Sequence, residues 1–464
     1  MRYISTRGTA PTVSFDEVLL VGLARDGGLY VPESWPEFSE AEIATWKEFS
    51  YTKLALEVMF PFVSDALSRN ELKGIIDDAY GQFETDKIVP IVNIENEEWL
   101  MELFHGPTLA FKDIAMQFLG SLFDHVLAKR SQTICIVGAT SGDTGSAAIA
   151  ALRNRKNINA FILYPHGRIS DVQRRQMTTV IADNISTIAL EGTFDDCQDA
   201  VKSLFNDLEF RDKHKLSAVN SINWARIMAQ VVYYFWAALK VGGPRQRVNF
   251  AVPTGNFGNV FAGYVAKRMG LPVKQFIVGS NSNDILTRFF ETGRMEIMDV
   301  QPTISPSMDI QISSNFERLL FEVYNRDGPR VADTLHNFRK TGILAVPMNI
   351  LEKVRELFNG ACFDDDETRS IINKTFIEKG ILLDPHTSVG LAAARECRLG
   401  ISEPMLVLAT AHPAKFPEAV MRASGSRPTL PKHLEDLMLR EEHINILVND
   451  VELIKDFIEK RTLE

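Results

Sequence analysis

Residues 133–152 read TICIVGATSGDTGSAAIAAL, a pattern from which the architecture can be inferred. The first five residues form an apolar run of strand length, Gly138 to Gly145 form a tight turn, and Ser146 to Leu152 favour a helix. A strand, a turn and a helix in this order are typical of an α/β protein with parallel sheets. The turn has neither the Gly-Lys-Ser/Thr of a Walker loop nor the dinucleotide glycine spacing. Main-chain N–H groups at such a helix start bind anions, and this turn suits a small carboxylate.

A second strand, turn and helix pattern lies at residues 248–268. The apolar run Val248 to Thr254 leads into Gly255-Asn256-Phe257-Gly258-Asn259, and a helical segment follows. This loop contains no Lys or Arg, so a phosphate here would be held by main-chain N–H groups and by the Asn side chains. Each loop taken alone is also compatible with an ordinary turn between a strand and a helix.

The segment Phe104 to Asp113, FHGPTLAFKD, places Lys112 in an apolar stretch with turn-forming residues. Burial disfavours the ammonium form and lowers the pKa of a lysine, which leaves an amine able to form a Schiff base or to take a proton from carbon. The alternative is a lysine that begins a helix and extends its charge to water. Together with two anion-binding turns, a reactive lysine completes the set of parts that a pyridoxal phosphate enzyme needs.

Several stretches, in the same order along the chain, resemble those of the threonine synthases, within the tryptophan-synthase-β-like family of pyridoxal phosphate enzymes. They comprise residues 27–32, 105–113, 141–145, 220–226, 255–259, 305–318, 384–387 and 409–416. The resemblance implies an α/β, multi-domain enzyme of fold type II, with parallel sheets flanked by helices and a helical N-terminal region. We expect a helix-rich domain at 1–90, an α/β domain bearing Lys112 at 91–240, and an α/β domain with the phosphate loop and the C-terminal helices at 241–464.

The resemblance also implies roles for individual residues. Lys112 is the catalytic residue, which carries the cofactor and transfers protons. The cofactor-binding residues are Lys112, Gly255, Asn256, Phe257, Gly258, Asn259 and Thr410. The substrate-binding residues are Thr108, Ser141, Gly142, Asp143, Thr144, Asn223 and Arg226. Arg226 is the candidate for a substrate phosphate because a guanidinium pairs with two phosphate oxygens, and a surface salt bridge is its alternative role.

The implied reaction converts O-phospho-L-homoserine and water to L-threonine and phosphate, the last step of threonine biosynthesis. A related phospho-lyase that releases 2-oxobutyrate would use the same lysine. A non-catalytic phosphoester-binding relative is the third interpretation, favoured only if the lysine were missing, and Lys112 is present. Product analysis separates the first two.

Composition is that of an ordinary globular enzyme. The 464 residues carry a net charge of −10, which argues against nucleic acid as a partner, and their length predicts more than one domain. The four cysteines are widely spaced, which indicates a reducing compartment. We expect a cytoplasmic monomer or homodimer that binds neither membrane nor metal, since the sequence has no spanning apolar stretch and no metal-ligand spacing.

Local patterns predict further elements. Residues 1–90 read as helix-rich, and Ile88 to Ile94 with Glu98 to Leu103 as two short strands. One apolar helical stripe runs from Ala115 to Leu127. The acidic residues 364–367 suggest a solvated helix start, and Asn449 with Glu452 suggests a capping pair for a final helix.

Overall fold

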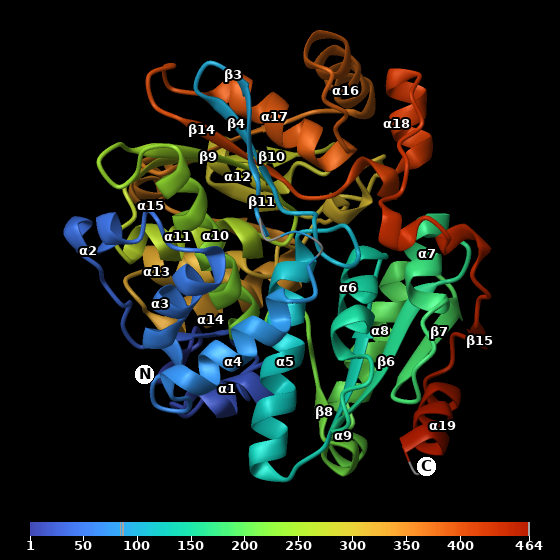
Figure 1. Ribbon diagram of the computed structural model, residues 1–464. Coiled ribbons are helices and arrows are strands. Elements are labelled where there is room, and N and C mark those ends of the chain that lie inside the picture. Colours follow the sequence, from blue (N-terminus) through green and yellow to red (C-terminus); the bar gives the residue numbers. More distant parts are fainter. Residues whose placement is uncertain (84, 86–87, 463–464) are drawn as a thin grey trace.

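Two sheets form the framework of the computed structural model, which describes residues 1–83, 85 and 88–462 (Figure 1). The larger sheet has six strands in the order β13-β10-β9-β14-β4-β3, and all neighbours are parallel except β3 and β4. Its strands are β3 (Ile91–Glu95), β4 (Glu98–Glu102), β9 (Val248–Pro253), β10 (Val273–Ser280), β13 (Phe358–Cys362) and β14 (Met405–Ala409). The predicted pair of short strands before the lysine segment is confirmed as the antiparallel hairpin β3–β4.

The second sheet has five parallel strands in the order β15-β7-β6-β5-β8. They are β5 (Ile134–Ala139), β6 (Ile158–Pro165), β7 (Ile185–Glu191), β8 (Leu216–Ser217) and β15 (Asn445–Val448). Helix α6 (Asp143–Leu152) follows β5, and α11 (Gly258–Arg268) follows β9, so both predicted strand–turn–helix units are confirmed. Each glycine-rich turn lies at the carboxyl end of a parallel strand, where ligands bind in such sheets.

The N-terminal region is rich in helices, as predicted. Its elements are β1 (Tyr3–Ser5), β2 (Tyr30–Pro32), α1 (Phe15–Val21), α2 (Glu40–Thr45), α3 (Tyr51–Val63) and α4 (Arg69–Tyr80). A serine precedes each helix, and at Ser14, Ser39 and Ser68 a glutamate three residues later completes a capping box. The strands β1 and β2 form a small antiparallel pair.

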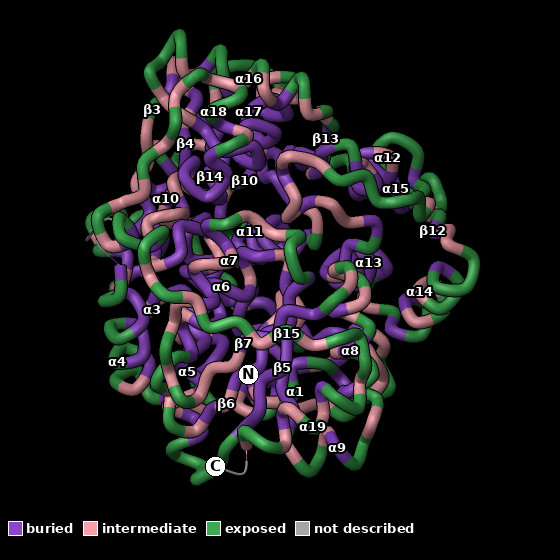
Figure 2. The backbone as a smooth tube through the Cα atoms, turned by 90° about the vertical axis from the view of Figure 1, so that its right-hand side faces the viewer, coloured by how far each residue is buried: buried purple, intermediate pink, exposed green. Residues whose placement is uncertain are grey.

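Two long helices pass through the interior. Helix α5 (Lys112–Arg130) buries the predicted apolar stripe, and α10 (Trp224–Lys240) is buried along nearly its whole length. Most strands of both sheets are buried as well, but the edge strands β3 and β15 are not. The outer helices α9 (Leu208–His214), α14 (Gly328–Thr341) and α16 (Asp365–Lys379) present exposed faces (Figure 2). Together these features confirm an α/β fold with parallel sheets flanked by helices.

The remaining elements are short. They are α7 (Asp171–Thr178), α8 (Phe194–Asn206), α12 (Ile285–Thr292), β11 (Arg294–Glu296), η1 (Pro306–Met308), α13 (Phe316–Val323), β12 (Ile343–Ala345), α15 (Met348–Arg355), α17 (Pro385–Cys397), η2 (Pro413–Lys415), α18 (Pro417–Ser424), η3 (Lys432–Leu434), η4 (Leu437–Leu439) and α19 (Val451–Thr462). The predicted solvated start of α16 is confirmed, because Asp364 caps it in a box with Glu367. The predicted cap of the last helix is wrong by one residue. Because α19 begins at Val451, the preceding Asp450 accepts the N–H of Glu452 at 2.8 Å.

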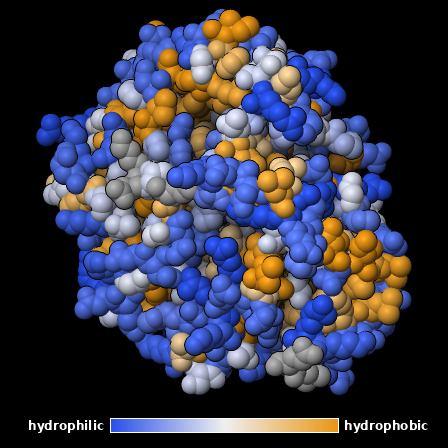
Figure 3. All heavy atoms as spheres, turned by 45° about the vertical axis from the view of Figure 1, so that its right-hand side comes forward, coloured by the Kyte–Doolittle hydropathy of each residue, from blue (hydrophilic) through white to orange (hydrophobic). Residues whose placement is uncertain are grey.

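The C-terminal segment returns from the larger sheet to the smaller one. Strand β15 pairs with β7, with Asn445 opposite Ile188. Apolar side chains gather over this edge strand in Figure 3, and Ile444, Ile446 and Val448 are all exposed by 40% or more. Each of the two sheets contains strands from both of the predicted ranges 91–240 and 241–464. The predicted domain boundaries near residues 90 and 240 therefore stay a prediction.

Candidate active site

The segment that carries Lys112 lies against the end of β14. The Phe111 N–H donates to the Thr410 carbonyl at 2.8 Å, and the His412 N–H donates to the Leu109 carbonyl at 3.0 Å. Leu109 has a positive φ of 63°, which turns the chain immediately before α5. Lys112 is therefore held at the first position of a helix, beside Thr410.

The Lys112 amine contacts a carboxylate. Its Nζ lies 3.1 Å from Oδ2 of Asp143, and its side chain is only 11% exposed. Burial lowers the pKa of Lys112, Asp143 opposes that effect, and the nearby charges of Lys415 and Arg226 reinforce it. The alternative of a lysine that extends to solvent is thus excluded.

The first glycine-rich turn wraps around one hydroxyl. Thr140 Oγ1 accepts the N–H groups of Gly142 and Gly145, at 2.9 and 2.8 Å. Gly142 has a φ of 129°, and a Cβ there would lie 2.4 Å from the Gln173 side chain, so only glycine fits. No hydrogen bond within the described part of the chain uses the N–H groups of Ser141, Asp143 or Thr144. These donors remain available at the start of α6.

The second turn is built from neutral hydrogen bonds. Thr254 Oγ1 donates to Oδ1 of Asn259 at 2.6 Å and accepts the Phe257 N–H at 3.1 Å. Phe257 lies in the left-handed region with a φ of 63° and is fully buried. Within the described residues, no hydrogen bond uses the main-chain N–H groups of Gly255, Asn256, Gly258 or Asn259.

Asp143 is the centre of a buried cluster that reaches both sheets. Its Oδ1 accepts from Gln173 at 2.9 Å and lies 3.0 Å from Lys415 Nζ, and its Oδ2 accepts from Ser307 Oγ at 3.2 Å. Burial alone would raise the pKa of Asp143, but Lys112 and Lys415 lower it well below its ordinary range. The carboxylate is therefore ionised.

Thr410, predicted to contact the cofactor ring, directly follows β14 and has a free hydroxyl. Its N–H donates to Thr387 Oγ1 at 3.2 Å, and its carbonyl accepts from Phe111. No side chain or main-chain group of the described residues hydrogen-bonds its Oγ1.

Arg226 is a buried cation near the lysine. It is 4% exposed and donates to the Val219 carbonyl at 3.1 Å, while its Nε is buried without a partner. Burial lowers its pKa to about 10. In the part of the chain that the structure describes, no carboxylate lies within ion-pair distance of it, which excludes the surface salt bridge. Such an unpaired guanidinium is a ready partner for an anion.

Two predicted substrate contacts have protein partners instead. The Asn223 side chain accepts the Ala225 N–H at 3.1 Å, as the cap of α10, and donates to the Leu19 carbonyl at 2.9 Å. The Thr108 hydroxyl donates to Asp113 at 2.6 Å. The substrate-binding roles of Asn223 and Thr108 stay predictions.

Known proteins give a consistent result along the whole chain. Family models described as the threonine synthase N terminus, a pyridoxal-phosphate dependent enzyme and the threonine synthase C-terminal region match residues 2–80, 88–335 and 387–458. The threonine synthase of Pseudomonas aeruginosa is 53% identical, over 99% of this chain and 98% of that protein. The chain belongs to the threonine synthase family.

Solved threonine synthases share its fold. The pyridoxal phosphate-bound enzyme from Brucella melitensis superposes with a TM-score of 0.97 at 50% identity, over 99% of each chain. The yeast enzyme gives 0.93 at 40% identity, over 100% of this chain and 99% of that one. The predicted family, the fold type II architecture and the dependence on pyridoxal phosphate are confirmed.

The residues of this threonine synthase fit the cofactor. A Cβ at Gly255 would lie 2.9 Å from Ile310 Cδ1 and 3.2 Å from Met308 Cα, so a side chain there would have to displace the end of Ile310. The unused N–H groups of this loop suit a phosphate, the Thr410 hydroxyl suits a ring nitrogen, and the Lys112 amine suits an aldehyde.

Three members of the Asp143 cluster were not assigned from the sequence. Ser307 and Lys415 lie in stretches that carry the family resemblance, which was the only signal for them, and Gln173 lies in no recognised motif. The Ser307 N–H donates to His386 Nε2 at 3.2 Å, and Nδ1 of His386 lies 2.9 Å from Asp384. This chain of contacts anchors the cluster to the larger sheet.

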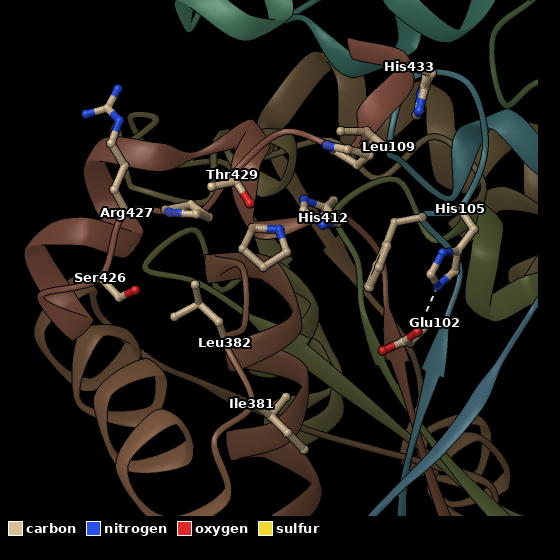
Figure 4. Close-up of a pocket in the computed structure, with 14 residues that line it drawn as sticks. Glu102, His105, Leu109, Ile381, Leu382, His412, Ser426, Arg427, Thr429 and His433 are labelled. Atoms are coloured by element: carbon tan, nitrogen blue, oxygen red, sulfur yellow. Dashed lines mark hydrogen bonds and ion pairs between the residues drawn. The ribbon is translucent and has the colours of Figure 1, made fainter. Parts of the chain in front are cut away.

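A cavity of about 630 Å³ opens beside the lysine segment and is lined in part by His105 and His412 (Figure 4). Nε2 of His105 lies 2.7 Å from Glu102, while Arg427 lies across the cavity. Burial lowers the pKa of His412 to about 4, and His105 adds to the effect. Lys112 does not line this cavity.

No group of three or more potential metal ligands comes together in residues 1–83, 85 and 88–462, and no helix among them could cross a membrane.

Proposed function

We propose that this enzyme converts O-phospho-L-homoserine and water to L-threonine and phosphate, the last step of threonine biosynthesis. The observation that carries the proposal is the buried Lys112 amine, which contacts Asp143 at 3.1 Å and has a second buried cation, Arg226, nearby. The threonine synthases to which the chain is similar support the same reaction.

In this proposal the cofactor is held at three points. Lys112 binds its aldehyde, the N–H groups of the loop Gly255 to Asn259 bind its phosphate, and the Thr410 hydroxyl hydrogen-bonds its ring nitrogen. When bound, pyridoxal phosphate supplies an electron-withdrawing ring that stabilises negative charge developing on the substrate. Because Thr410 is neutral, it does not force a positive charge on the ring.

The substrate is bound at its two charged ends. The free N–H groups of Ser141, Asp143 and Thr144, with Gly142 as the cap, bind the carboxylate at the start of α6, where the helix dipole adds partial positive charge. The Arg226 guanidinium binds the phosphate, and Asn223 positions Arg226 by capping the same helix. Two anionic groups are thereby fixed with the substrate carbons between them.

Lys112 moves the protons. Its amine, whose pKa is lowered by burial, takes the proton from the substrate Cα. A second proton leaves Cβ as the phosphate is expelled from Cγ, and Cγ then takes up a proton. Cα regains its proton after water has added at Cβ. Arg226 keeps hold of the expelled phosphate, and water adds at Cβ to give threonine. Enclosure of the cluster by the buried Gln173 and the half-buried Ser307 limits competing release to solvent.

The test combines a visible spectrum with product analysis. The wild-type holoenzyme and the Lys112→Ala variant are compared, with Lys129→Ala, an exposed lysine on the same helix, as the matched control. The wild type and the control should show the band of lysine-bound cofactor and should release threonine and phosphate from O-phosphohomoserine, and Lys112→Ala should do neither. Release of 2-oxobutyrate would identify a phospho-lyase, and absence of the band in cofactor-replete wild type would leave a non-catalytic binding protein.

We also propose that the enzyme acts in the cytoplasm as a monomer or homodimer. The four cysteines are all free thiols, which suits a reducing compartment. Sedimentation velocity of the holoenzyme distinguishes the two assemblies, and any larger species would contradict both.

A further inference from the structure

Lys415 is a second buried lysine at the site, and its ammonium group is fully coordinated. It ends the short helix η2, and its side chain is 0% exposed. Its Nζ lies 2.7 Å from the Thr108 carbonyl, 2.9 Å from Gln176 Oε1 and 3.0 Å from Asp143 Oδ1. An ammonium has three N–H donors, and each of these finds one acceptor. The Nζ of Lys415 therefore has a complete set of acceptors.

Lys112 has a much poorer set of partners. Its only polar contact among the described residues is Asp143 Oδ2, and its other close neighbour is the Phe111 ring, 4.9 Å from Nζ to the ring centre. The two lysines thus share one carboxylate. The pair Asp143 and Lys415 is neutral by itself, so a proton on Lys112 adds an uncompensated charge to a buried cluster.

The other charged groups around the cluster do not cancel the positive charge that a proton on Lys112 adds. Arg226 adds a further positive charge near Lys112. His386 accepts the Ser307 N–H through Nε2 and lies next to Asp384 through Nδ1. Asp113 faces Lys415, and its two oxygens accept hydrogen bonds from Thr108. With Asp113 counted as an anion, the three cations Lys112, Lys415 and Arg226 still outnumber the two carboxylates Asp143 and Asp113 by one. Lys112 is the group that can relieve the excess by losing its proton.

We propose that Lys415 is a positioning residue. Because Lys415 pairs with Asp143, Lys112 has no carboxylate of its own to neutralise an ammonium charge, and it is left as a neutral amine that can take the substrate proton. Lys415 also ties the lysine segment to α7, since the same ammonium binds Thr108 and Gln176. The proposal rests on the proposed role of Lys112 as the cofactor lysine.

The experiment is a pH titration of the visible absorption of the bound cofactor in the full-length holoenzyme. Four forms are compared: wild type, Lys415→Met, Asp143→Asn and the double variant. In Lys415→Met, Asp143 pairs with Lys112 alone and stabilises the proton on the Lys112 nitrogen. The midpoint of the absorption titration should therefore rise by about one pH unit. On the Asp143→Asn background, the Lys415 substitution should shift it much less. Lys267→Met removes a lysine that bonds a main-chain carbonyl elsewhere and should leave the midpoint unchanged.

Several outcomes overturn the proposal. An unchanged midpoint in Lys415→Met with cofactor bound, or an equal shift with and without Asp143, would mean that Lys415 only supports the fold. Should Lys415→Met fail to fold, Lys415→Gln takes its place, and Lys415→Arg should retain the wild-type midpoint. Acetylation of Lys112 in the cofactor-free full chain, followed by mass spectrometry, gives a second midpoint on the pH scale. In Lys415→Met this midpoint must also shift to higher pH. Failure of the proposed function is distinguished because Lys112→Ala would then keep the absorption band.

Discussion

The two glycine-rich turns both present main-chain N–H groups at a helix start, but they are stabilised by different forces. The turn before α6 contains Asp143, an ionised carboxylate between two buried lysines. The turn before α11 contains no charge and is closed by the neutral hydrogen bonds of Thr254 and Asn259. The turn before α6 is thus stabilised by ion pairs, and the turn before α11, which we call the cradle, is stabilised by neutral hydrogen bonds.

This difference assigns the turns to different tasks. A neutral cradle keeps the same donors in place while protons move nearby, which suits the fixed phosphate of a cofactor. A charged turn responds to each proton gained or lost by Lys112, which suits the end of the site where proton transfer occurs. Changes to the first turn should therefore affect charge balance, and changes to the second should affect packing.

The largest effect is expected from Asp143→Asn, which leaves a buried lysine without its carboxylate. We expect the free energy of unfolding to fall by about 4 kcal/mol, measured by urea denaturation of the full chain. Asp171→Asn is the control, because that carboxylate is 67% exposed and its pair with Arg174 is worth about 0.5 kcal/mol. Equal losses in the two variants would show that the first turn does not depend on its charge.

The glycines give the next largest effect. Gly142→Ala should cost about 3 kcal/mol, because its φ of 129° is strained for alanine and the new Cβ displaces Gln173 from Asp143. Gly255→Ala should cost about 1 kcal/mol, since its closest neighbour is the mobile end of Ile310. Thermal unfolding of both variants measures the two losses of stability. A larger loss for Gly255→Ala than for Gly142→Ala would contradict the prediction that the first turn is the less tolerant of a side chain.

A smaller loss is expected from Thr254→Val. The change removes two hydrogen bonds and keeps the shape, so the free energy of unfolding should fall by about 2 kcal/mol. Affinity for pyridoxal phosphate should fall as well, because the loop loses its closure. Thr334→Val, on the exposed face of α14, is the matched control. Unchanged cofactor affinity would disprove the cradle role of the second turn.

The smallest effect concerns acid. The folded pKa of Asp143 lies below its unfolded value, so its stabilisation is complete above the unfolded pKa and declines as the pH falls through the folded pKa. The difference in unfolding free energy between wild type and Asp143→Asn should narrow by about 1 kcal/mol over the first pH unit below about 3.9. Urea titrations at a series of pH values measure it. The matching difference for Thr254→Val should stay constant, and a parallel decline would contradict the distinction between the turns.

Local patterns were sufficient for the elements but not for the cluster around Asp143. The turn at Gly142 and the apolar stripe of α5 depend on residues close in sequence, which is why they could be predicted. Lys415 and Thr108 are 307 residues apart along the chain, and no periodicity indicates their contact. The Asp450 cap was missed because Asn449 is an equally good capping residue, and only the observed helix start decides between neighbours.

The route of the C-terminal segment has a consequence for the growing chain. A ribosome releases Lys112 and both glycine-rich turns well before Thr410 and Lys415, and β15 cannot pair with β7 until residue 445 is made. Ile454 and Ile458 of α19 then cover the apolar core of the smaller sheet. A chain made only as far as residue 409 therefore carries Lys112 without the contacts that Thr410 and Lys415 make around it in the folded protein.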